Sequence, residues 1–476
     1  MRRQSAASPL LPIAIACALG LPLVANAAPQ ATGAGSRAAR ASTSARETAL
    51  EARVNQLEQE LNELKAEIQA QAQVQRAAAA APPPPAPAPA VAAAPEKPVF
   101  STGPGLAVQL HGFISASAFS QNRAMTFGNG QNAEFPVPGA RGSMSGVDVR
   151  NTRFWLDFSG AQFAGDWTGG GRIEMDFFGG FNGTGAYSQQ QPTPRLRQAY
   201  LDLDKASTGT LIRIGQQWEL MFPLDDVPAS LSHVAFPLGF GTGMIGWRFP
   251  GIVLMQDLNH GTSGVKWRLD LGAFEGSWSG PGDNVNFMTA GNAGFRPQLE
   301  ARLRAQGSNW VAYVAGHYSQ IDLRGVGSTT PTPVTPTFSS TAYEVGGKWT
   351  PGTWVFMGTA YSGRGMGQIF GDLAQFGDIK DTGGFVQIGD HFTPNWSAYA
   401  FYGMSKPDST DVIRWMGNGS AGRLRSRQSA LSLQYTQGPY DLGVEFMHAN
   451  LDSTTNGVNR QSTSGNQLSL SALWHF

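Results

Sequence analysis

The sequence lacks the features that mark several common classes of protein. It has one cysteine in 476 residues, so no disulfide framework can form. After the first 30 residues it has no run of about 18 apolar residues, which excludes a protein that crosses a membrane with helices. Its 34 basic residues are balanced by 34 acidic ones, which disfavours a nucleic-acid-binding protein. Charged residues make up only 14%, against roughly 25% in soluble domains, whereas 59 glycines favour a secreted or cell-envelope β protein.

The N-terminus has the pattern of a secretory signal peptide. Two arginines at positions 2–3 precede an apolar stretch at 10–24, and Ala25-Asn26-Ala27 matches a cleavage site. Residues 1–27 are therefore predicted to be removed, which takes away Cys17 and leaves a mature chain without cysteine. Lipid attachment at Cys17 is the weaker alternative, because the residues before it do not match a lipid-attachment motif.

A short coiled coil is predicted between a flexible Gly/Ala/Ser stretch at 28–46 and a Pro/Ala-rich linker at 77–99. Within residues 47–76, apolar side chains alternate in steps of four and three, which places them on one seam facing a partner helix. A single amphipathic helix lying on a barrel or membrane is the alternative, but the outer face is acidic, and membrane-surface helices are usually rich in Lys and Arg. The expected oligomerisation seam consists of Leu50, Val54, Leu57, Leu61, Leu64 and Ile68.

Residues 100–476 are predicted to form an all-β transmembrane barrel of about 16 antiparallel strands. Seven short connections alternate with eight long loops rich in Gly, Asn and Ser, and this segregation of loop length is typical of outer-membrane barrels. We expect the short connections at 159–166, 204–210, 258–264, 306–309, 350–353, 391–395 and 436–439, and the long loops at about 121–148, 179–194, 219–243, 275–296, 319–341, 362–381, 403–426 and 451–466.

The side-chain pattern within the strands indicates which face is turned to lipid. The stretches 171–177, 267–274 and 299–305 alternate apolar residues with ionised ones, as expected for a lipid-facing exterior and a polar lumen. Seven of the 12 tryptophans lie beside a predicted short turn or the C-terminus, which favours an interfacial aromatic girdle at one end. The last strand ends in Phe476, which resembles the C-terminal assembly signal of bacterial outer-membrane barrels.

Taken together, these segments resemble the DcaP-like family of trimeric outer-membrane porins. The stretches RLRQAYLDL (195–203) and RIGQQW (213–218) are similar to strand segments of that family before its third long loop. The resemblance implies a homotrimer in the bacterial outer membrane, with the coiled coil in the periplasm. It also implies passive transport of small organic anions such as dicarboxylates.

The strand pattern and the resemblance together select a set of basic residues for the pore wall. Arginine stays ionised and offers a planar fork that matches a carboxylate, so inward-facing arginines favour anions. Alternation places six arginines and one lysine on the lumen face, and Arg197 is added on the resemblance alone. The expected pore or substrate contacts are Arg153, Arg172, Arg197, Arg213, Lys266, Arg268, Arg302 and Arg304.

The segment 219–241 is unusually apolar for an exposed loop, so we expect it to fold into the lumen. There its Asp225 and Asp226 are expected to face the arginines across a constriction, as charge rings do in selective channels. The alternative is a wall of Arg–Asp and Arg–Glu pairs that only stabilise the barrel. The 25 basic and 27 acidic residues from position 100 onward keep this alternative open.

Other functions have less support in the sequence. The seven histidines show no metal-binding spacing, no nucleotide-binding or hydrolase motif is present, and adjacent Ser232 and His233 rarely form a catalytic pair, so we expect neither an enzyme nor a bound metal or cofactor. A general-diffusion porin without anion preference remains an alternative. A further alternative is an envelope tether in which the coiled coil grips the cell wall. Outer-membrane lipids and small anionic solutes are the expected partners.

Overall fold

The computed structural model describes residues 99–476 except 104, 127, 180–191, 276–284, 287–290, 293–296, 323–333, 336, 368, 370 and 374–376, together with Gln59 and Lys65. The chain divides into two units, Met1–Ala94 and Pro95–Phe476. The signal peptide, the linker and the coiled-coil seam lie outside the described residues and stay predictions. Gln59 and Lys65 are helical and exposed. No helix in the described ranges is long and apolar enough to cross a membrane.

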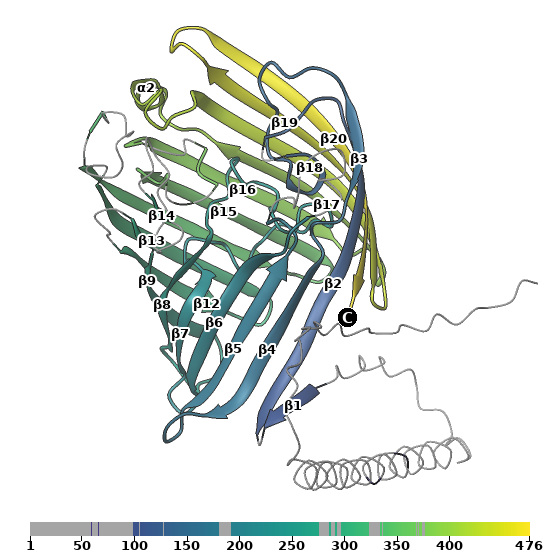
Figure 1. The fold of residues 1–476 in the computed structure, drawn as a ribbon, viewed down its shortest axis with the longest axis vertical. Coiled ribbons are helices and arrows are strands. Elements are labelled where there is room, and N and C mark those ends of the chain that lie inside the picture. Colours follow the sequence, from purple (N-terminus) through teal and green to yellow (C-terminus); the bar gives the residue numbers. More distant parts are fainter. Residues whose placement is uncertain are drawn as a thin grey trace, which may run out of the picture. The chain divides into compact units, whose positions relative to one another are not determined.

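In the described part of the second unit, sixteen long antiparallel strands close into a barrel, which confirms the predicted fold (Figure 1). Each strand pairs with its neighbours in sequence, and the ring closes where the first long strand, β2, pairs with the last, β20. The barrel strands are β2 (Leu106–Gln121), β4 (Arg153–Gln162), β5 (Thr168–Asp176), β6 (Arg195–Lys205), β7 (Thr210–Trp218), β8 (Arg248–Asp257), β9 (Lys266–Phe274), β12 (Gln298–Gln306), β13 (Trp310–Asp322), β14 (Thr337–Trp349), β15 (Trp354–Arg364), β16 (Lys380–Asp390), β17 (Trp396–Ser405), β18 (Arg423–Gln437), β19 (Tyr440–Thr454) and β20 (Arg460–His475).

Shorter elements complete the description. The strand β1 (Val99–Gly103) extends the β2 edge, and β3 (Met144–Asp148) continues the line of β4 by pairing with the far end of β2. A separate hairpin joins β10 (Val285–Asn286) to β11 (Gly291–Asn292). The helical turns are η1 (Gly130–Asn132) and α2 (Ser409–Arg414).

The barrel is apolar outside and polar inside, the reverse of a soluble barrel. On β12, Leu299 and Leu303 are 47% and 37% exposed, whereas the alternating Glu300 and Arg302 are buried. An exterior of this kind can be stable only against hydrocarbon, since water would oppose so large an apolar surface. The predicted alternation is therefore confirmed on this strand.

All seven short connections form at one end of the barrel, six of them within two residues of their predicted bounds. The first was predicted to start at 159, but β4 continues to Gln162. Five of the tryptophans beside the short connections or at the C-terminus are 39–51% exposed, and two of these, Trp349 and Trp354, stack with Phe356. These are Trp267, Trp349, Trp354, Trp396 and Trp474. They form the aromatic girdle expected at a membrane interface.

The prediction of a long loop at 451–466 is wrong. The strands β19 and β20 continue to Thr454 and from Arg460, and residues such as Asp452 and Ser462 still pair across them. Polar side chains mark this stretch as a loop in the sequence. In the structure these residues belong to the β19–β20 hairpin, which extends beyond the apolar band.

The barrel seam depends on a glycine under the last residue. Gly112 of β2 exchanges two backbone hydrogen bonds with Phe476, at 3.2 and 3.0 Å. A Cβ at Gly112 would lie 2.5 Å from both the Phe476 ring and the Arg153 carbonyl oxygen. Only a residue without a side chain lets the C-terminal ring lie this close to the wall.

We therefore predict that Gly112→Ala lowers the free energy of barrel unfolding by about 1–3 kcal/mol, the usual effect of overpacking. The measurement is the urea midpoint of the folded, heat-modifiable form in detergent. The control is Gly316→Ala in β13, where the nearest atom to a new Cβ is 3.9 Å away. Equal losses in the two variants would contradict this role of Gly112.

Candidate functional site

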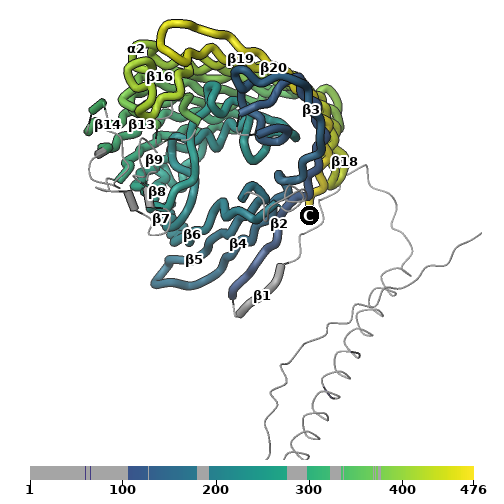
Figure 2. Tube along the Cα trace, turned by 45° about the horizontal axis from the view of Figure 1, so that its top comes forward, coloured from purple at the N-terminus to yellow at the C-terminus, as the bar shows by residue number. Residues whose placement is uncertain are grey.

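The loop between β7 and β8, residues 219–247, packs against the inner face of the wall. Its apolar side chains form a buried cluster with inward-facing residues of β15 to β19, and Figure 2 shows the teal segment after β7 inside the ring of strands. The loop contributes Phe222, Ala235, Phe236, Leu238, Phe240 and Met244, and the wall contributes Val355, Met357, Phe385, Phe401, Ala430 and Met447. The loop thus fills the side of the lumen next to these strands.

Polar side chains of the wall hold the backbone of this loop. The Ala229 N–H donates to Gln387 of β16 at 2.7 Å, and the Gly239 N–H donates to Gln428 of β18 at 2.8 Å. These bonds satisfy loop N–H groups that would otherwise be buried without partners.

A buried carboxylate on β19 holds the middle of the loop. Glu445 accepts from the Ser230 hydroxyl at 2.6 Å and lies 2.7 Å from His233 Nδ1. His233 Nε2 and the Ser232 hydroxyl make no hydrogen bond to any described residue, so Ser232, His233 and Glu445 do not form a catalytic triad. Among the described residues, no group of three or more acidic, His or Cys side chains could hold a metal ion.

A cavity of about 310 Å³ remains between the loop and the wall formed by β4 to β8. Five of the eight basic residues predicted for the pore line it. These are Arg153, Arg172, Arg197, Arg213 and Arg302. On the opposite side the loop presents Leu224, Val227, Val234 and Pro237. The cavity is therefore basic on one side and apolar on the other.

Two of these arginines are neutralised by direct cross-strand partners. Arg172 faces Asp157 across β4 and β5 and binds both carboxylate oxygens, at 2.7 and 2.9 Å. Arg213 faces Asp202 across β6 and β7 in the same way, with both distances at 2.8 Å. Opposite charges on directly opposed residues of neighbouring strands attract each other. Because each pair is neutral as a whole, these two sites add little net charge to the cavity.

Next to these pairs, three arginines share two buried carboxylates. Asp176 accepts from Arg195 at 3.0 and 2.6 Å and from Arg197 at 2.7 Å. Glu174 accepts from Arg197 and lies 3.7 Å from Arg153. This part of the wall therefore carries more positive than negative charge.

A bulge explains why the sequence pattern around Arg197 was ambiguous. Opposite β6, Glu174 pairs with Gln198 and the adjacent Met175 pairs with Leu196, so Arg197 is the extra residue. A bulge reverses the inward and outward alternation beyond it, which lets both Arg197 and Gln198 face the cavity. Leu196 and Leu201 accordingly both point outward.

The remaining basic residues of the prediction lie apart from the cavity lining. Arg268 lies 2.7 Å from the buried Asp270, which it shares with the cavity-lining Arg302 at 3.0 Å. Arg304 binds both oxygens of Asp225 in the loop at 2.7 Å, which ties the loop to β12. Lys266 is exposed at the short-turn end of β9.

Asp225 and Asp226 point to different partners although they are adjacent. Burial alone would raise the pKa of Asp225, but the hydrogen bonds and charge of Arg304 lower it below its usual value. Asp226 accepts the Gly347 N–H at 3.2 Å, and burial raises its pKa to about 8. Asp225 is therefore ionised at neutral pH, whereas Asp226 is mostly protonated.

Sequence reasoning missed Arg248 and Trp218. Trp218 lines the cavity, and its ring stacks on Phe222 of the loop with ring centres 3.7 Å apart. Strand alternation would turn Arg248 outward, like Ile252 and Leu254. Its side chain is instead buried, at 5% exposure, because it lies where the strand joins the loop. Alternation does not predict side-chain direction at such strand ends.

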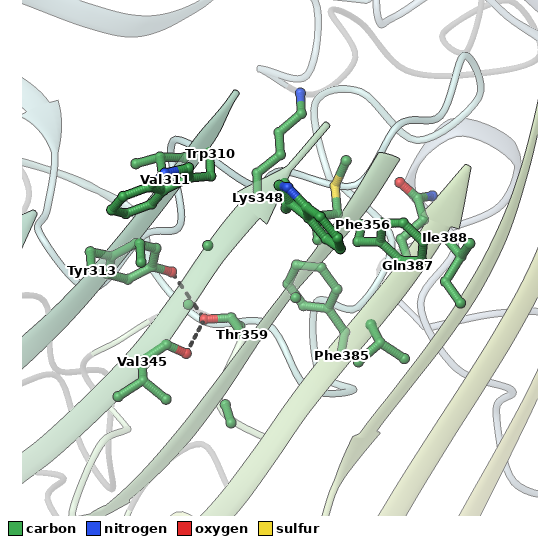
Figure 3. A pocket seen from close by; sticks show the side chains of 18 residues that line it. Trp310, Val311, Tyr313, Val345, Lys348, Phe356, Thr359, Phe385, Gln387 and Ile388 are labelled. Atoms are coloured by element: carbon green, nitrogen blue, oxygen red, sulfur yellow. Dashed lines mark hydrogen bonds between the residues drawn. The ribbon is translucent and has the colours of Figure 1, made fainter. Parts of the chain in front are cut away.

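A second hollow, of about 870 Å³, belongs to the outer surface. It lies along β13 to β16, where Gly347 and Gly358 thin the wall, and its outward lining includes Val345 and Ile388 (Figure 3). Behind it, the Tyr313 hydroxyl bonds Thr359 at 3.0 Å. Because its exposed lining is apolar, this hollow is not the candidate passage.

The contrasting states of Asp225 and Asp226 give a test by pH. For Asp226 the folded-state pKa lies above the ordinary value of 3.8, so folding opposes ionisation and stability falls as pH rises from about 4 to about 8. We predict that Asp226→Asn removes this loss, so that the variant gains stability over the wild type up to about pH 8. Asp225→Asn should destabilise the barrel at pH 7, because the lowered pKa of Asp225 stabilises the fold above its ordinary pKa. Urea midpoints at pH 5, 7 and 9 measure both, and an unchanged pH profile in Asp226→Asn would contradict the assignment.

No protein-family model and no curated protein matches the chain. Among solved structures, the crystal structure of the outer membrane channel DcaP of Acinetobacter baumannii matches with a TM-score of 0.60 and 18% identity, over 79% of this chain and 99% of that one. Salmonella typhi OmpF in complex with daunomycin matches with a TM-score of 0.49 and 14% identity, over 79% of this chain and 100% of that one. The barrel therefore has the fold of the outer membrane channel DcaP, as the sequence resemblance predicted.

Proposed function

We propose that this protein is a porin of the bacterial outer membrane, a passive channel for small solutes. Three features support the proposal: the apolar exterior, the polar interior, and the fold shared with the DcaP channel. A closed barrel satisfies the backbone hydrogen bonds of its strands within a bilayer, so this architecture suits a membrane. The loop 219–247 narrows the passage to the side lined by β4 to β8.

The excess of arginine at this narrow part carries the proposal of anion preference. The barrel as a whole is close to neutral, but the carboxylates near the cavity are shared among more numerous arginines. Arg153, Arg195 and Arg197 share Glu174 and Asp176, and Arg268 and Arg302 share Asp270. Low-dielectric walls focus the electric field of these residues into the cavity. The position of the charged residues therefore affects ion selectivity more than the net charge of the barrel does.

The shape of the cavity suits a short organic anion with carboxylates. An arginine fork can replace part of a carboxylate's hydration shell. The apolar loop residues Leu224, Val227 and Val234 lie opposite and can contact the carbon chain of the same molecule. Dicarboxylates, which the family resemblance implies, fit both surfaces.

The proposal extends to assembly and location. The resemblance and the heptad pattern support a homotrimer with a periplasmic coiled coil, surrounded by outer-membrane lipids. Contact of the coiled coil with the cell wall belongs to the alternative of an envelope tether. A general-diffusion porin is the competing function, and the ion pairs Arg172–Asp157 and Arg213–Asp202 favour it, because they cancel part of the basic charge.

Planar-bilayer recording with a dicarboxylate tests the proposal. We predict transient block of the wild-type current by the dicarboxylate. Replacing Arg172, Arg213 and Arg302 together by Ser should weaken this block about tenfold or more, the loss expected when charge-assisted hydrogen bonds worth about 1.5–3 kcal/mol disappear.

The matched control replaces Arg364, Arg425 and Arg427 by Ser. These three arginines are also ion-paired but do not line the cavity. The control should leave the block unchanged. A wild-type current that the dicarboxylate does not affect would favour the general-diffusion porin.

A further inference from the structure

Arg248 is a buried cation without an ionic partner. Its side chain is 5% exposed, and it makes no ion pair or hydrogen bond with any described residue. One of its terminal nitrogens, Nη1, is fully enclosed without an acceptor. The other two arginines buried to this extent among the described residues, Arg197 and Arg302, each have a carboxylate oxygen within 3.1 Å.

Two indole rings take the place of a carboxylate. The Arg248 Cζ lies 4.6 Å from the centre of the Trp218 ring and 4.2 Å from that of Trp247. Attraction between a desolvated guanidinium and an indole face is worth about 2 kcal/mol. Two such faces stabilise the charge, but they do not neutralise it. Arginine in turn does not readily give up its proton.

The position of Arg248 couples its charge to the passage. Trp218 lines the cavity, and the Arg248 Cζ lies 4.6 Å from the centre of its ring, so the cation lies close to the cavity. The distance of 4.6 Å is well within the screening length of about 8 Å at physiological ionic strength. Arg248 also interacts electrostatically with Arg195 and Arg197 and with the two carboxylates that these arginines share, Asp176 and Glu174.

We propose that Arg248 determines the charge selectivity of the pore, as a fixed, solvent-excluded cation that attracts anions through its field and without contact. This inference rests on the proposed function of the protein as a channel. In this account the arginines that line the cavity contact the solute directly, whereas Arg248 acts on it only through its electric field. Because Arg248 is buried and forms no ion pair with a described residue, its charge acts on every anion irrespective of shape.

The test is the reversal potential of the full-length protein in a planar bilayer under a tenfold KCl gradient. We expect Arg248→Met, which keeps a long flexible side chain between the indoles, to lower the chloride-to-potassium permeability ratio about twofold or more, as loss of a potential of order kT requires. Arg248→Lys keeps the charge and should keep the wild-type ratio. If the Met variant fails to form a heat-modifiable barrel, Arg248→Gln is measured in its place.

The control removes a complete ion pair that does not line the cavity, with Arg425→Gln and Asp452→Asn combined. This change leaves the net charge unaltered and should not move the reversal potential. A neutral Arg248 variant with the wild-type ratio, in a folded barrel, would overturn the inference. A wild-type pore without anion preference would instead contradict the proposed anion channel, while a shift toward potassium in Arg248→Met would still support the role of Arg248.

Discussion

The docking of residues 219–247 onto the inner wall is the interaction on which the passage depends. The inward face of β15 to β17 carries Val355, Met357, Phe385 and Phe401, side chains that a water-filled lumen would leave exposed. The loop covers them with its own apolar residues, and each side chain buried in this way contributes about 1.5–3 kcal/mol. Gln387, Gln428 and Glu445 accept hydrogen bonds from the loop and so fix its register on the wall.

This arrangement divides the lumen into two unlike halves. The side at β13 to β19 is occupied by the loop, and the side at β4 to β8 stays open and carries the arginines. Within the open half, cross-strand pairs keep individual arginines in place, while shared carboxylates and the unpaired Arg248 leave positive charge uncancelled. A barrel that is nearly neutral in total can thus present a basic surface at its narrowest part.

Much of the fold could be predicted from the sequence, because each strand repeats one simple pattern. The number of strands could be predicted from the short turns between stretches in which apolar and polar residues alternate. The ionised residues of β12 indicated a polar lumen. The pattern failed where local geometry breaks the alternation. The bulge at Arg197 reverses it, and at Arg248 the strand gives way to the loop.

Other features depend on contacts between distant segments, which no local pattern contains. Asp225 and Asp226 are adjacent in the sequence, and the prediction treated them alike. Only the packing of the loop gives them different partners. Asp225 meets Arg304, 79 residues further along the chain, whereas Asp226 turns to the Gly347 backbone. The polar ends of β19 and β20 were mistaken for a loop, because composition does not distinguish a polar loop from a hairpin beyond the membrane.

A disulfide between loop and wall tests the central claim, that the loop lies docked inside the barrel. The Thr242 and Ser426 hydroxyls are 2.8 Å apart, and cleavage of the predicted signal peptide would leave no native cysteine. With Thr242→Cys and Ser426→Cys combined, the account predicts that a disulfide forms in the oxidising envelope and that single-channel conductance is the same before and after reduction. Free thiols that react with a bulky reagent in the folded barrel, or a conductance that rises on reduction, would contradict it.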